Sequence, residues 1–278
     1  FVKLTPVEIP GVDESQQLSL SNPMAINRGA ATHAMAVSIL EEYARRGREG
    51  DAFAPWFSID PPFPDGAFGD DLLVAGAYVN GGIMPLVGGE LARAAFEHGA
   101  ERYGVDLLRR YHALIAERGE THLWYFPDGR PASVETSTSP EAQPTDGWGS
   151  SGMLYALVEG LAGVEDRGRC FDRIRLAPRW AAAEVDEAEV DVGYAASGAR
   201  VAYRYEARGG TVRLELDTPT SDVSCRVLLP EGTRAERVRC GSQTVEHVET
   251  SVQQSRYVDF EATQGPSIEI DLGGTRAE

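Results

Sequence analysis

The chain of 278 residues carries 43 acidic side chains against 26 basic ones, and its formal net charge is −17. This charge argues against a nucleic-acid-binding protein, which would present basic surfaces to phosphate groups. No run of about 18 apolar residues is present, so the sequence predicts no membrane-spanning helix. With 42% hydrophobic and 25% charged residues, the composition indicates a globular rather than a disordered protein.

Arginine supplies all the basic side chains except Lys3. The excess of acid with almost no lysine predicts a strongly hydrated surface and suggests a halophilic source. Cys170, Cys225 and Cys240 form neither a CxxC motif nor a disulfide framework. We therefore expect free thiols in a reducing compartment, and hence a cytoplasmic protein.

The first part of the chain, residues 1–165, is predicted to be helical. Apolar side chains recur every three or four residues in four stretches, and glycines follow the ends of these stretches. The expected helices cover about 28–46, 85–98, 101–118 and 149–162.

Two long connections between these helices, 53–84 and 119–148, are rich in aromatic residues. Connections of this length without regular structure are usually functional or disordered, and the aromatic content argues against disorder. These loops are therefore the expected location of functional side chains.

Residues 171–278 alternate apolar and polar side chains with a period of two, without a helical pattern. Short strands separated by turn signals favour an antiparallel β-sandwich. Together with the helices, they predict an α+β multidomain fold. The expected strands are Arg173–Leu176, Ala188–Tyr194, Arg200–Glu206, Thr211–Asp217, Val223–Leu229, Ala235–Arg239, Tyr257–Glu261 and Ser267–Leu272.

Several common catalytic motifs are missing from the sequence. It has no GxxxxGK[ST], no HExxH and no GxSxG, and no GxGxxG is expected to open a helix. No histidine has a partner at metal-ligand spacing, so we expect no metal and no cofactor. The histidines are His33, His98, His112, His122 and His247.

Carboxylates instead accompany aromatic residues in the two long loops. Trp56 and Asp60 lie in the first loop, and Trp124, Tyr125 and Glu135 lie in the second. Sugars present apolar C–H faces that stack on aromatic rings, and hydroxyls that bond to carboxylates and amides. Glycosidic bonds are cut by paired carboxyl groups. These residue types therefore point to a carbohydrate partner.

Three segments resemble parts of the bacterial six-hairpin glycosidases, whose twelve helices form an (α/α)6 barrel. The segment Tyr78–Pro85 is similar to their Tyr-x-Asn-Gly-Gly-x-x-Pro turn at a helix start. The segment from Glu135 to Trp148 resembles a polar loop in which a leading Glu precedes a Gly-Trp helix start. The run from Gly147 to Trp180 resembles the passage from such a barrel into a C-terminal β-domain, as in rhamnosidases and disaccharide phosphorylases.

The resemblance implies roles for individual residues. In processing α-glucosidase I and its bacterial relatives the leading Glu is the general base of an inverting mechanism, which implies that role for Glu135, with Glu141 as the alternative. Aromatic residues would stack on the sugar, Asn80 would bond to hydroxyls, and Gly81 would let the backbone approach closely. The substrate-binding residues implied in this way are Asn80, Gly81, Trp56, Asp60, Trp124, Tyr125 and Trp148.

Each of these assignments has a structural alternative. Trp124 and Tyr125 could simply plug the barrel, and Asn80-Gly81 could be only a tight turn before a helix. Asp60 could be a helix cap or a turn residue.

The resemblance places the partner acid upstream of Phe1, and Asp60 and Asp65 are the early loop acids in this sequence. Twelve helices with their connections need about 240–360 residues. The predicted domains are therefore 1–165, an (α/α)6-type domain incomplete at its N-terminus, and 171–278, the β-sandwich.

The leading hypothesis is an inverting glycoside hydrolase that cleaves an α-linked gluco-configured oligosaccharide. We expect no cofactor, and neither nucleic acid nor a membrane as partner. The sequence predicts no oligomeric state. Three alternatives remain open. The first is a disaccharide phosphorylase, with Ser150 and Ser151 in a phosphate pocket. The second is a polysaccharide lyase that uses His122 and Tyr125. The third is a non-catalytic sugar-binding module.

Overall fold

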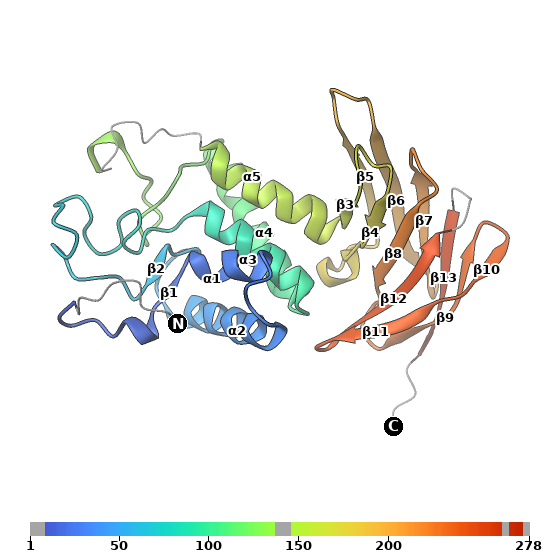
Figure 1. Ribbon diagram of the computed structural model, residues 1–278, viewed down its shortest axis with the longest axis horizontal. Helices are drawn as coiled ribbons and strands as arrows, with labels where there is room; N and C mark the ends of the chain where they lie inside the picture. The colour runs from blue at the N-terminus through green and yellow to red at the C-terminus, as the bar shows by residue number, and fades with distance from the viewer. Residues whose placement is uncertain (1–8, 137–145, 263–266, 275–278) are drawn as a thin grey trace. The chain divides into compact units, whose positions relative to one another are not determined.

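The computed structural model describes residues 9–136, 146–262 and 267–274 (Figure 1). Within these residues, five α-helices and thirteen strands confirm the predicted α+β class, and the assignment of the helices to part of an (α/α)6 toroid stays a prediction. Among the described residues, no helix combines the length and the apolar character needed to cross a membrane.

Contacts within the chain define two compact units, which are described separately. The predicted division at 165–171 stays a prediction, since the second unit also includes a short segment from the first half. The helical unit is Phe1–Ala95 with Asp106–Ala156, and the sheet unit is Phe96–Val105 with Leu157–Glu278.

All four expected helices are present, and one further helix precedes them. The helices are α1 (Ser21–Asn27), α2 (His33–Glu49), α3 (Pro85–Glu97), α4 (Glu101–Arg118) and α5 (Gly147–Tyr155), which continues as a π-helix over Ala156–Leu161. A two-stranded sheet in the helical unit pairs β1 (Leu18–Ser19) with β2 (Ile59–Asp60).

The first expected helix, about 28–46, begins later than predicted. Thr32 is the N-cap of α2, and its hydroxyl accepts a hydrogen bond from the backbone N–H of Met35 at 3.3 Å. Gly29, with φ of +71°, interrupts the helical path before this cap. The preceding helix α1 has no side-chain cap hydrogen bond, and the sequence analysis did not predict it.

Helices α3 and α5 approach each other closely because glycines face each other. A Cβ added to Gly89 would lie 2.4 Å from the carbonyl carbon of Gly152, and one added to Gly149 would lie 2.7 Å from the Pro85 Cβ. The expectation about GxGxxG was wrong, because residues 147–152 have this spacing and open α5. Gly149 and Gly152 lie at the contact between α3 and α5. Close helix packing is therefore a sufficient physical reason for glycine at these two positions of the GxGxxG spacing.

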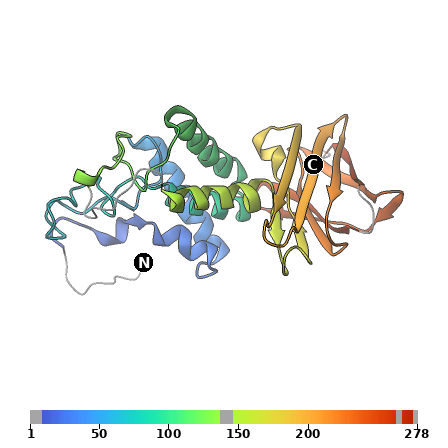
Figure 2. The same ribbon diagram turned by 90° about the horizontal axis from the view of Figure 1, so that it is seen from above.

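The sheet unit contains two sheets that share one apolar core (Figures 1 and 2). The six-stranded sheet has the order β10-β9-β13-β7-β6-β5 and is antiparallel throughout. The five-stranded sheet has the order β11-β12-β8-β4-β3. Its β4 and β8 are parallel, so the expectation of a purely antiparallel arrangement was wrong at this pair.

The eight expected strands are all present, and three short strands were missed. The sheet also begins at Val164, before the expected start at 171. The strands are β3 (Val164–Asp166), β4 (Ile174–Leu176), β5 (Glu187–Gly193), β6 (Arg200–Arg208), β7 (Thr211–Asp217), β8 (Val223–Leu228), β9 (Thr233–Cys240), β10 (Gln243–Val245), β11 (Val248–Val252), β12 (Ser255–Ala262) and β13 (Ser267–Gly274).

Period-two alternation separates the two faces of the six-stranded sheet. Val212 and Leu214 on β7 pair with Ile270 and Ile268 on β13, and all four side chains are fully buried. Arg213 lies between them on the opposite face, where its guanidinium is 2.6 Å from the carboxylate of Glu269.

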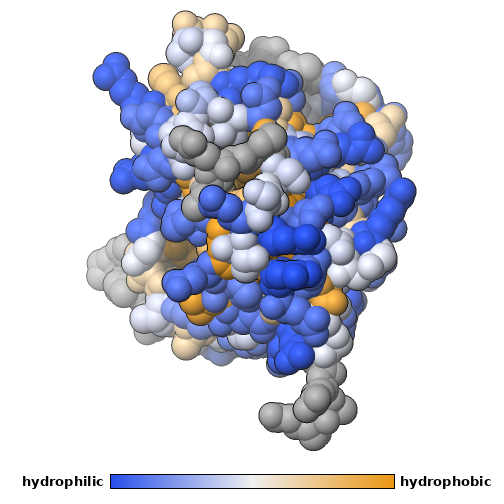
Figure 3. Space-filling view, turned by 90° about the vertical axis from the view of Figure 1, so that its right-hand side faces the viewer, coloured by the Kyte–Doolittle hydropathy of each residue, from blue (hydrophilic) through white to orange (hydrophobic). Residues whose placement is uncertain are grey.

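Further cross-strand ion pairs join Arg239 to Glu269 and Arg237 to Asp271, each at 2.7 Å. The face shown in Figure 3 is mostly hydrophilic, with small scattered apolar areas. Exposed pairs of this kind stabilise a protein little, and their main effect is to balance and hydrate this surface.

A fully buried arginine anchors the interior of the sheet unit. Arg179 is 1% exposed, and its guanidinium donates to the carbonyls of Gly160 at 2.6 Å and Ala177 at 3.1 Å. It also pairs with Glu97 and donates to the Tyr257 hydroxyl at 3.3 Å. Because these acceptors lie on separate segments of the chain, one cation holds all of them.

The charge of Arg179 also sets the ionisation of Glu97. Burial by itself raises the pKa of the Glu97 carboxyl, but the positive charges of Arg179 and Arg175 outweigh it, and the net pKa lies below 4.5. A lowered pKa means that ionised Glu97 stabilises the fold above about pH 4.5, and that this stabilisation is lost as the pH falls through the lowered value.

Arg179→Met should reduce the free energy of unfolding by about 3 kcal/mol, because it leaves buried carbonyls without a donor and removes the nearer of the two arginines that pair with Glu97. Arg102→Met is the matched control. Arg102 pairs with Glu231 on the surface, and its loss should change stability by less than about 1 kcal/mol. Urea unfolding at pH 7 and pH 4 measures both. Equal small losses in the two variants would contradict the anchoring role of Arg179.

Candidate functional site

The two long loops of the helical unit pair with each other at one end of the helices (Figure 1). Ile83 and Tyr125 exchange two backbone hydrogen bonds of 2.8 Å, one in each direction. Bridges also join Phe57 to Ile83 and Tyr125 to Pro131. N–H and C=O groups of these loops that have no partners in a helix or sheet form hydrogen bonds from one loop to the other.

Three of the aromatic residues expected to bind sugar lie inside this loop cluster. Trp56, Trp124 and Tyr125 have no exposed surface. The Phe53 ring contacts Trp56 and Tyr125 edge to face, with centroid distances of 6.0 and 5.7 Å, and Trp124 contacts Phe126 at 4.7 Å. These rings pack against each other inside the loop cluster, and whether Trp124 and Tyr125 plug a barrel stays a prediction.

Asn80 is also fully buried, and the loop backbone occupies its amide group. Its Oδ1 accepts from the Phe63 N–H at 2.7 Å, while its Nδ2 donates to the carbonyls of Phe63 at 3.1 Å and Leu73 at 3.0 Å. In this arrangement the amide closes the loop 63–80 on itself. The turn alternative for Asn80 therefore has direct geometric support.

The next two residues need to be glycine for different reasons. Gly81 has φ of +101°, a conformation that residues with side chains rarely adopt. A Cβ on Gly82 would lie 2.5 Å from the carbonyl oxygen of Tyr78. The turn before α3 can therefore form only with small residues at both positions.

Asp60 and Gly81 from the predicted set line one open pocket of about 670 Å³ within the helical unit. The pocket also contains Arg46, Asp51 and Asp128, which the sequence analysis did not select. A signal for Arg46 was its place in the last turn of a helix, whereas nothing in the sequence linked it to Asp60.

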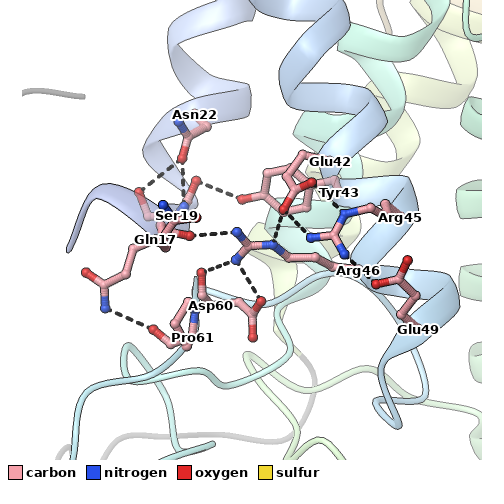
Figure 4. A network of polar contacts seen from close by, with 11 residues as sticks. Gln17, Ser19, Asn22, Glu42, Tyr43, Arg45, Arg46, Glu49, Asp60 and Pro61 are labelled. Carbon is pink, nitrogen blue, oxygen red and sulfur yellow. Dashed lines mark hydrogen bonds and ion pairs between the residues drawn. The ribbon is translucent and has the colours of Figure 1, made fainter. Parts of the chain in front are cut away.

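Arg46 fixes the orientation of Asp60 (Figure 4). Its guanidinium donates to the Asp60 carboxylate at 2.8 Å, to the Gln16 carbonyl at 2.6 Å and to Glu42 at 2.7 Å. Hydrogen bonds from Arg45 and Arg46 lower the pKa of Glu42 to about 2. Asp60 is thus a strand residue held by an ion pair and not a helix cap.

Glu135 is exposed on the short 3-10 turn Val134–Thr136, outside the lining of the pocket. Hydrogen bonds from the Ser133 hydroxyl and from its own backbone N–H lower the pKa of Glu135 below 4.5. Its carboxylate is therefore ionised at neutral pH. The alternative base, Glu141, lies outside the described residues.

Trp148 is the exposed aromatic residue of the predicted set, with 62% of its surface accessible in the first turn of α5. Asp146 caps this helix through the backbone N–H groups of Trp148 and Gly149. The Ser150 and Ser151 hydroxyls, considered for a phosphate pocket, donate to backbone carbonyls one turn earlier.

The two residues considered for lyase chemistry lie in the loop cluster. The backbone N–H of His122 donates to the Tyr125 hydroxyl at 2.9 Å. Burial lowers the pKa of His122 and raises that of Tyr125, so both are uncharged at neutral pH. Within the described part of the chain, no three His, Cys, Asp or Glu side chains form a group that could hold a metal ion.

No family model matches the sequence, and no curated protein matches it. Two solved structures with partial similarity are glycoside hydrolases. The GH78 family rhamnosidase of Bacillus sp. GL1 has 18% identity and a TM-score of 0.48 over 77% of this chain and 19% of that chain. Ara127N-Se, a GH127 β-L-arabinofuranosidase from Geobacillus stearothermophilus T6, has 13% identity and a TM-score of 0.31 over 76% of this chain and 35% of that chain.

The present chain therefore spans about a fifth of the length of the rhamnosidase and about a third of the length of the arabinofuranosidase. At these levels of similarity, neither structure assigns a site residue in this chain.

Asn80→Asp should destabilise the helical unit by about 2 kcal/mol, because a carboxylate cannot donate to the carbonyls of Phe63 and Leu73. Asn22→Asp is the matched control. Within the described residues Asn22 bonds through its Oδ1, which accepts from the Ser19 N–H at 2.7 Å, and Asp keeps this acceptor. Thermal and urea unfolding of both variants should separate them by more than 1 kcal/mol, and equal stabilities would exclude the loop-closing role of Asn80.

Proposed function

We propose that this chain belongs to a glycoside hydrolase, and that the pocket beside Asp60 and Gly81 binds a sugar ring. The observation that carries the proposal is the composition of this pocket, which is lined by carboxylates, one arginine and apolar side chains. Two of its lining residues, Asp60 and Gly81, belong to the set that the sequence resemblance implies for sugar binding.

The size and chemistry of the pocket support a sugar as its ligand. A volume of about 670 Å³ lies within the usual range of about 300–1,000 Å³ for small-molecule sites. Phe57 and Ile83 provide apolar contact for ring C–H groups, and Asp51, Asp60 and Asp128 provide acceptors for hydroxyls. Arg46 bonds to one oxygen of the Asp60 carboxylate, Oδ2, and its position orients the other.

Glu135 is the proposed general base. As an ionised carboxylate it would remove a proton from the water that attacks the anomeric carbon, with inversion of configuration. The partner acid would stand about 6.5–9.5 Å away to admit this water. Trp148, which follows Glu135 in the sequence and is exposed, is the proposed stacking residue. The proposed substrate is an α-linked gluco-configured oligosaccharide.

Glu135→Gln should reduce kcat about 100-fold or more and leave KM nearly unchanged, since the amide cannot accept the proton but keeps the shape. Glu117→Gln, another exposed glutamate of the helical unit, is the control and should retain full activity. The assay measures release of reducing sugar from α-linked gluco-oligosaccharides, with the anomeric form of the product read by proton NMR. A fully active Glu135→Gln enzyme would falsify the base assignment.

A further inference from the structure

The short turn that carries Glu135 is closed by two hydroxyl-bearing residues. The Ser133 N–H donates to the Thr136 Oγ1 at 2.8 Å, and the Thr136 N–H donates to the Ser133 carbonyl at 3.2 Å. The Thr136 hydroxyl also donates to this carbonyl at 3.2 Å and lies 3.3 Å from the Ser133 hydroxyl. One threonine side chain therefore both accepts from and donates to the residue three positions earlier.

The base of this turn rests on the buried loop cluster. Ala132 is 8% exposed, and its N–H donates to the Trp124 carbonyl at 3.1 Å. Pro131 forms a bridge with Tyr125, and both Trp124 and Tyr125 are fully buried. The turn is thus attached to a fully buried part of the loops, while Glu135 itself is exposed.

We propose that Ser133 and Thr136 are positioning residues, which fix the turn that carries Glu135 and so place its carboxylate for proton abstraction. The Thr136 hydroxyl keeps this turn closed, because it accepts from the Ser133 N–H at 2.8 Å and donates to the Ser133 carbonyl at 3.2 Å. A glutamate on an open loop would lose conformational entropy when it takes up the position for proton abstraction. A glutamate on a closed turn has already lost this entropy during folding, so the loss does not add to the activation free energy. This inference rests on the proposed base role of Glu135.

The lowered pKa of Glu135 agrees with this arrangement, because the Ser133 hydroxyl is the leading cause of the shift. Hydrogen bonds to the charged form of a carboxyl favour ionisation. Removing the Ser133 hydroxyl, or opening the turn by removing the Thr136 hydroxyl, should therefore return the pKa of Glu135 toward 4.5, and the acidic limb of the pH–rate profile should move to higher pH with it.

The test compares Ser133→Ala, Thr136→Val and Thr136→Ser. Thr136→Val keeps the shape of threonine without its hydroxyl, and we expect kcat to fall about tenfold with little change in KM. Thr136→Ser keeps the hydroxyl and should restore kcat to near the original value. Thr218→Val removes a comparable turn hydroxyl, which donates to the Thr220 carbonyl at 2.8 Å in the sheet unit, and should leave kcat unchanged.

A second measurement does not depend on activity. Carboxyl-13C glutamate labelling, with Glu135→Gln to assign the resonance, gives the pKa of Glu135 in each variant. An upward shift in Ser133→Ala and Thr136→Val, absent in Thr136→Ser and Thr218→Val, is the expected result. An unchanged pKa and kcat in both hydroxyl-deleted variants would overturn the positioning role. Failure of the base role would appear separately, as full activity of Glu135→Gln beside an intact pKa response.

Discussion

The helical unit depends on the buried amide of Asn80. Loops without regular structure bury backbone groups that must find partners, and the Asn80 side chain satisfies three of them between residues 63 and 80. The closed loop then presents Gly81 to the pocket and leads directly into α3. The position of the candidate site therefore depends on the hydrogen bonds that the buried Asn80 amide forms.

The aromatic residues contribute to the site indirectly. Trp124 and Tyr125 form an interior layer to which the outer parts of the loops attach, so the pocket and the Glu135 turn stand on a packed base. Two carboxylates lie outside this packed layer: Asp60 lines the pocket and bonds to Arg46, and Glu135 is exposed on its turn. In the proposed function, burial provides the rigid base and these carboxylates would provide the chemistry.

The sheet unit divides its charges in a different way. Surface arginines such as Arg213 pair with acids directly opposite on the neighbouring strand, which accommodates many charges at little energetic consequence. Arg179 is instead fully buried, with its donors bound to backbone carbonyls, Glu97 and Tyr257. Arginine suits both roles because its planar group donates in several directions and stays charged.

The sequence by itself determined the elements with a strong period: four helices and eight strands were predicted, and all are present. It also selected Asp60 and Gly81, which both line the open pocket, and their role in sugar binding stays a prediction. Only the tertiary structure decided that Arg46 meets Asp60 and that Trp124 faces inward. Hydrophobic periodicity reports local conformation, whereas the partner of a loop side chain depends on which distant segment folds against it, and short-range pattern contains no record of that contact.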